Sequence, residues 1–189
     1  LNDGRPVYYR CDPSHDFLPD PAEIETLVSS RTRAIVLINP NNPTGATYPR
    51  DLLERIVAIA AKHRLLLMVD EIYDQVLYDG AEFIPMATLV RETLCCTLSG
   101  LSKIYRACGY RGGWAVFSGD LEHAGGYLQG LELLASLRLC PNVPAQWAMQ
   151  TALGGYQSIR ELTAPGGRLY ESRRAIVEAV ARSKYLKLT

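Results

Sequence analysis

The chain has 189 residues, of which 48% are apolar and 21% are charged, a composition typical of a globular protein that can bury a substantial core. Its 20 basic and 20 acidic residues cancel, and no run of lysines or arginines suits phosphate backbones or anionic lipid, so we expect neither a nucleic-acid nor a membrane partner. Five cysteines without disulfide or zinc spacing, and three scattered histidines, predict no metal site and a reducing compartment, with the cytoplasm as the default location.

The first half of the chain predicts a βαβ unit. Residues 33–39, RAIVLIN, form an apolar run that we expect to be a strand buried on both faces, and the turn-forming NPNNPTG follows it. Apolar residues recur at helical spacing from Pro49 to His63. RLLLMVD at 64–70 then indicates a second buried strand that ends at Asp70. Strand, loop, helix and strand in this order predict a parallel crossover.

The second half adds further strands and then helices. We expect strands at Leu94–Leu98 and Gly113–Phe117, followed by helices at about 121–139, 143–154 and 168–183. The predicted fold class is therefore α/β. In open α/β sheets ligands bind beyond the carboxyl ends of the strands, which directs attention to Asn42–Gly45, Asp70–Tyr73 and Ser99–Lys103.

Asp70 leaves a strongly apolar strand, where a carboxylate is costly to desolvate without a cationic partner. Taken alone, it could equally cap the segment that follows, and Tyr73 could be a half-buried aromatic with a wet hydroxyl. Lys103 follows an apolar strand among small residues, and a surface lysine is the simple alternative. A lysine that is partly desolvated near other cations has a lowered pKa and can attack an aldehyde.

Together these residues describe one ligand, pyridoxal 5′-phosphate. The planar donor fork of an arginine suits a phosphate. Lys103 would bind the aldehyde, and Asp70 would bind the ring nitrogen. Asn42 and Tyr73 would contact the phenolic oxygen, whereas Ser102 and Arg111 would hold the phosphate. A protonated ring nitrogen would make the ring an electron sink for a substrate carbanion.

Three motifs, NPNNPTG at 39–45, DEIYD at 70–74 and SGLSKIYRACGYRGGW at 99–114, resemble the signatures of fold-type I pyridoxal-phosphate aminotransferases of class I/II. The flanking sequence is similar to the bacterial glutamate–pyruvate (alanine) branch. This resemblance implies the aspartate-aminotransferase-like fold, with a mostly parallel sheet flanked by helices, and a homodimer. Residues 1–155 would be the central part of the large cofactor domain, and 156–189 a connecting helical region leading to a small domain. The N-terminal segment and the small domain would lie outside the chain.

The resemblance also implies roles for single residues. Lys103 would hold the cofactor covalently and shuttle a proton, Asp70 would bind the ring nitrogen, and Tyr73 the ring oxygen. Asn42 would contact that oxygen and the substrate carboxylate, and Ser102 and Arg111 would bind the phosphate. Many relatives have a second phosphate-binding serine where this chain has Gly100, so phosphate binding would depend more on a helix N-terminus and Arg111. Ser99 is a weak substitute, because on an extended backbone it would point elsewhere.

Three functions remain open at this point. The first is an aminotransferase with a ping-pong cycle that uses a small amino acid, L-alanine above all, with 2-oxoglutarate and pyruvate. The second is another enzyme of the same fold and cofactor, such as a β-lyase, a decarboxylase or an aminocyclopropane-carboxylate synthase. The third is a regulator that senses the cofactor and carries a DNA-binding module, against which the neutral charge argues.

Overall fold

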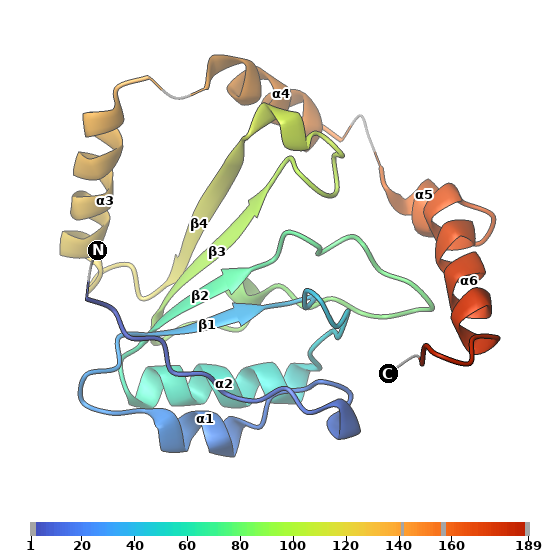
Figure 1. The fold of residues 1–189 in the computed structure, drawn as a ribbon. Helices are drawn as coiled ribbons and strands as arrows, with labels where there is room; N and C mark the ends of the chain where they lie inside the picture. The colour runs from blue at the N-terminus through green and yellow to red at the C-terminus, as the bar shows by residue number, and fades with distance from the viewer. Residues whose placement is uncertain (1–2, 141, 156–157, 188–189) are drawn as a thin grey trace.

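Four strands form one mixed sheet at the centre of the chain (Figure 1). The computed structural model describes residues 3–140, 142–155 and 158–187. The strands are β1 (Ala34–Ile38), β2 (Leu66–Asp70), β3 (Leu94–Gly100) and β4 (Gly113–Gly119), in the order β1-β2-β3-β4. The first three are parallel, whereas β4 pairs antiparallel with β3 because a loop, without a crossover helix, turns the chain back between them. The four predicted strands and the mostly parallel sheet are confirmed.

The helices also follow the predicted positions closely. Those described are α1 (Pro21–Leu27), α2 (Arg50–Lys62), α3 (Gly125–Arg138), α4 (Val143–Leu153), α5 (Arg160–Thr163) and α6 (Arg168–Ala181). Three short 3-10 turns are η1 (Pro13–His15), η2 (Met86–Thr88) and η3 (Cys108–Tyr110). α1, α5 and the 3-10 turns were not predicted from the sequence. None of the helices in the described part of the chain is both long and apolar enough to cross a membrane.

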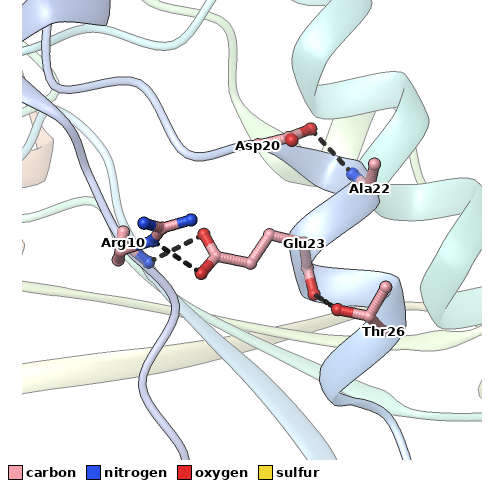
Figure 2. Close-up of polar contacts among 5 residues, drawn as sticks. All are labelled: Arg10, Asp20, Ala22, Glu23 and Thr26. Carbon is pink, nitrogen blue, oxygen red and sulfur yellow. Dashed lines mark hydrogen bonds and ion pairs between the residues drawn. The ribbon is translucent and has the colours of Figure 1, made fainter.

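Helix α1 shows a local signal that could have been found in the sequence (Figure 2). The Asp20 carboxylate accepts a hydrogen bond of 2.9 Å from the Ala22 N–H and so caps the helix. The Arg10 side chain donates to Glu23 at 2.9 Å, and the Thr26 hydroxyl donates to the Glu23 carbonyl at 2.7 Å. The contact between Arg10 and Glu23 attaches the extended N-terminal segment to α1.

The main core lies between one face of the sheet and the two helices α1 and α2 (Figure 1). Its fully buried side chains include Leu53 and Ile56 of α2 and Leu37, Leu67 and Val69 of the sheet. Val36, on the opposite side of β1, is 56% exposed. The prediction that this strand is buried on both faces is therefore wrong for the described residues, because α1 and α2 cover only one of them.

The remaining helices lie around the periphery of the sheet (Figure 1). α4 packs on the loop that follows β3, where Leu101, Ala145 and Ala152 form a second, small core. α6 contacts the loop that follows β2, since Arg173 pairs with Asp79 at 2.7 Å. The loops that follow β2 and β3 leave the same edge of the sheet but contact different helices, α6 and α4 respectively.

Candidate active site

The carboxyl ends of β1, β2 and β3 meet at one edge of the sheet, and the three sequence motifs leave from that edge. The parallel register aligns Ile38 with Asp70, and Asp70 with Leu98. Backbone hydrogen bonds continue the ladder beyond it, since the Asn39 N–H donates to the Asp70 carbonyl at 3.0 Å and the Glu71 N–H to the Leu98 carbonyl at 2.9 Å. Strand pairing alone therefore brings the starts of the three motifs together.

Asp70 is half-buried at the last position of β2. Its Oδ1 accepts a 3.0 Å hydrogen bond from the Ile72 N–H, which closes a tight turn. The alternative interpretation of Asp70 as a cap is therefore correct for a turn, although no helix follows at residues 71–75. Within the described residues Oδ2 has no hydrogen-bond donor, which leaves one carboxylate oxygen for a cationic N–H group.

Lys103 lies in the loop after β3 and faces the motif that follows β2. Its Nζ is 5.3 Å from the centre of the Tyr73 ring. The pKa of Lys103 is raised above its ordinary value, first by its interaction with the Tyr73 side chain and then by electrostatic interactions with Cys108 and Asp70. Slight desolvation opposes this rise. The prediction of a desolvated lysine with a lowered pKa is therefore wrong for this structure, because Lys103 is exposed and its neighbours are acidic.

Arg111 is in the same loop as Lys103, close to the start of β4. Its backbone is left-handed, with φ of 51°, and its Nη1 donates to the Cys108 carbonyl at 2.9 Å. The Leu101 N–H donates to the Gly112 carbonyl at 3.1 Å, which closes the loop at its base. Ser102 is half-buried next to Lys103. The only described helical turn within this loop is the three-residue η3, so the expected helix N-terminus for the phosphate is not found there.

Asn42 is exposed in the loop after β1, and no hydrogen bond within the described residues joins it to the other candidates. The loop itself is well anchored. Asn39 is 2% exposed, and its Oδ1 accepts a 2.9 Å hydrogen bond from the Tyr48 N–H. The Asn41 Oδ1 accepts one of 2.8 Å from the Thr44 hydroxyl. These two anchors were not predicted from the sequence, although an amide at the end of an apolar strand was a visible signal.

Ser99 lies inside β3, because this strand continues to Gly100. Side chains alternate along a strand, so Ser99 shares a face with Cys95 and Thr97. Asp70 is aligned with Leu98, which belongs to the opposite face. This placement agrees with the expectation that Ser99 points elsewhere, and its Oγ has no hydrogen-bond partner within the described residues.

The functional groups at this edge fit pyridoxal phosphate. An amine, a carboxylate with one open oxygen and a phenol lie together, and a guanidinium occupies the same loop as the amine. These are the donors and acceptors that an aldehyde, a ring nitrogen, a ring hydroxyl and a phosphate require. Two hollows of about 360 Å³ lie elsewhere, one beside residues 77–81 and α5, the other beside Arg33 and Arg64. The candidate site itself lies at the carboxyl edge of the sheet, where β1, β2 and β3 end.

Comparison with known proteins agrees with this geometry. The family described as aminotransferase class I and II matches residues 1–189. The chain is 55% identical over 180 residues to the glutamate-pyruvate aminotransferase AlaA of Escherichia coli K12, covering 95% of this chain and 44% of that protein. It is 53% identical to an alanine aminotransferase of Mycobacterium tuberculosis H37Rv, covering 92% of this chain and 40% of that protein.

Solved structures give the same result. A crystal structure of an Escherichia coli aminotransferase superposes with a TM-score of 0.90 at 54% identity, covering 94% of this chain and 44% of that one. An alanine aminotransferase from Pyrococcus furiosus gives 0.82 at 34% identity, covering 96% and 45%. The chain thus spans less than half the length of these relatives.

Proposed function

The chain belongs to the class I and II aminotransferase family, and on that premise we propose that the complete gene product containing it exchanges an amino group between L-alanine and 2-oxoglutarate. Glutamate and pyruvate would be the products, and the reverse direction would use the same site. The names of the similar proteins support these substrates. The observation that carries the proposal is the meeting of Lys103, Tyr73 and Asp70 at the carboxyl edge of the sheet.

The family depends on pyridoxal phosphate, which supplies, when bound, a ring that accepts the electron pair left by the departing Cα proton. Asp70 would keep the ring nitrogen protonated through its open oxygen. Lys103 would hold the aldehyde carbon and, when free, move a proton at the substrate Cα. Tyr73 lies next to this amine and would hold the phenolic oxygen.

The other candidate residues would bind and orient. Ser102 and Arg111 would hold the phosphate, and the bidentate fork of Arg111 suits that group better than a point charge would. Asn42 would contact the phenolic oxygen and the substrate carboxylate. We further propose that residues 1–155 form the central part of the cofactor domain, that 156–189 lead to a small domain, and that the enzyme is a cytoplasmic homodimer.

An amine-exchange assay of the complete gene product tests the reaction. With L-alanine, 2-oxoglutarate and added pyridoxal phosphate, we expect pyruvate and glutamate to appear in equal amounts. The Lys103→Ala variant of the same protein serves as the negative control. Release of ammonia or carbon dioxide in place of glutamate would contradict the proposal and favour a lyase or a decarboxylase.

A further inference from the structure

Glu71 is a buried acid to which the proposed reaction gives no role. It follows Asp70 directly and is 6% exposed. Its Oε1 accepts a 2.8 Å hydrogen bond from the Met86 N–H of η2, and its own N–H donates to the Leu98 carbonyl of β3 at 2.9 Å. Its carbonyl accepts a 3.0 Å hydrogen bond from the Asp74 N–H. One residue therefore ties the turn 71–74 to two other parts of the fold.

Strand alternation places Glu71 on the core side of the sheet, away from the Asp70 side chain. Its surroundings there are Met86, which is 1% exposed, and the titratable groups of Asp74 and Cys95. No cation pairs with the Glu71 carboxylate in the part of the chain that the structure describes. Burial, with a smaller contribution from Asp74, raises the pKa of Glu71 to about 7, although the Met86 N–H opposes the rise.

A buried acid without a cation is costly, and an apolar side chain of the same length would pack there at lower cost. Packing alone therefore does not explain Glu71. The hydrogen bond to Met86 does, because it connects the site turn to η2 at its buried first residue, and an apolar residue could not make it. An apolar residue of the same length would keep the volume of Glu71 but would leave the Met86 N–H without this acceptor.

We propose that Glu71 is a positioning residue that holds Asp70 and Tyr73 in place through its hydrogen bond to the Met86 N–H. The inference rests on the proposed function of those two residues. Tyr73 lies within the turn that Glu71 ties down, and Asp70 immediately precedes it. A misplacement of about 1 Å in such a group can reduce a rate by about 10²-fold.

Two substitutions of similar length separate the acceptor from the packing. Glu71→Gln keeps an oxygen that can accept from the Met86 N–H, whereas Glu71→Met keeps the length and removes the acceptor. Hydrogen exchange in the cofactor-free, complete gene product is the first measurement. We expect the Met variant to exchange faster in peptides covering 71–76 and 84–88 but not in α2, and the Gln variant to match the wild type. Equal exchange in all three proteins, or equal acceleration in both variants, would overturn the proposal.

Binding and turnover are the second measurement. The Met variant should bind pyridoxal phosphate about 10-fold more weakly and lose on the order of 10- to 100-fold in kcat with a smaller change in KM. The Gln variant should stay within about 3-fold of the wild type in each, as should Glu82→Ala, a control at an exposed glutamate of a nearby loop. If the Met variant does not fold, Glu71→Asp, which is too short to reach Met86, takes its place with the same expectations. A Met variant whose hydrogen exchange matches the wild type but whose affinity for pyridoxal phosphate is reduced would also contradict the proposal.

The two measurements distinguish a failure of the positioning role from a failure of the proposed function. A wild-type protein that neither binds pyridoxal phosphate nor transaminates refutes the proposed function, while the exchange rates still report on the Glu71 contact. Normal turnover in the Met variant refutes the positioning role and leaves the proposed function standing.

Discussion

The Nζ of Lys103 lies 5.3 Å from the centre of the Tyr73 ring, so that the amine of one loop faces the phenol of another. The two loops follow adjacent parallel strands, β2 and β3, which end at the same edge of the sheet. Because the strands carry both loops, the contact depends on the sheet and not on either motif alone. Asp70, at the end of β2, contributes to the same electrostatic environment.

Replacing Tyr73 by Phe should lower the pKa of Lys103. The Tyr73 side chain is the largest cause of the raised pKa, and its loss removes an interaction that favours the protonated amine. The rate at which an amine-selective reagent modifies Lys103 in the cofactor-free protein, followed against pH, should therefore shift to lower pH. Tyr8→Phe, at an exposed tyrosine of the N-terminal segment, is the control. An unchanged pH profile would show that the tyrosine hydroxyl does not act on Lys103.

Lys103→Ala should abolish turnover and covalent retention of the cofactor. Loss of a group that both binds the aldehyde and moves a proton should reduce kcat on the order of 10²- to 10⁴-fold or more. Borohydride reduction followed by mass spectrometry of the peptides measures retention directly. Lys62→Ala, on the exposed side of α2, should behave as the wild type. A labelled peptide that excludes position 103 would assign the covalent role to another lysine.

Asp70→Asn should leave the cofactor bound and slow the chemical step. An amide keeps the size of the side chain but no longer stabilises a protonated ring nitrogen, so we expect kcat to fall on the order of 10²- to 10⁴-fold. Single-turnover kinetics with the saturated enzyme measure this step. Asp51→Asn, in the exposed first turn of α2, serves as the control. A near-normal rate would remove Asp70 from the ring nitrogen.

Gly112→Ala should destabilise the loop that carries Arg111. A Cβ at this position would lie 2.9 Å from the Ala145 Cβ of α4 and 2.8 Å from the end of the Met149 side chain. Overpacking of this kind costs about 1–3 kcal/mol. Gly109→Ala, where a Cβ would meet nothing within 4 Å, is the matched control. Denaturant unfolding of both variants checks the difference, and equal stabilities would contradict the packing of α4 on this loop.

The stability of the protein should fall as pH rises through the titration range of Glu71. The pKa of this buried acid is about 7 in the folded state against an ordinary value of 4.5, so folding favours its protonated form. This contribution to the free energy of unfolding is complete below about pH 4.5 and is lost as pH rises through about 7. Its size is at most roughly 3 kcal/mol.

Glu71→Gln provides the comparison for this pH dependence. Because glutamine does not titrate, this variant should gain stability relative to the wild type between about pH 5 and pH 8. Denaturant unfolding at both pH values measures the gain. A constant difference between the two proteins would show that Glu71 does not titrate in this range.

Much of the fold could be predicted from the sequence, because its signals are local. The apolar runs that end in NPNNPTG and at Asp70 indicate strands, and the spacing of apolar residues from Pro49 to His63 indicates a helix. α1 was missed although Asp20 and Pro21 are a start signal, because the helix is short and its apolar pattern is weak.

The sequence by itself determined which chemical groups stand at the ends of which strands, and with them the family and its cofactor. Only the tertiary structure decided how these groups act on one another. The raised pKa of Lys103, the exposed outer face of β1 at Val36 and the bond from Met86 to Glu71 all depend on segments far apart in the chain. The physical reason is that strand and turn preferences act over a few residues, whereas burial and electrostatic interactions depend on distance in space.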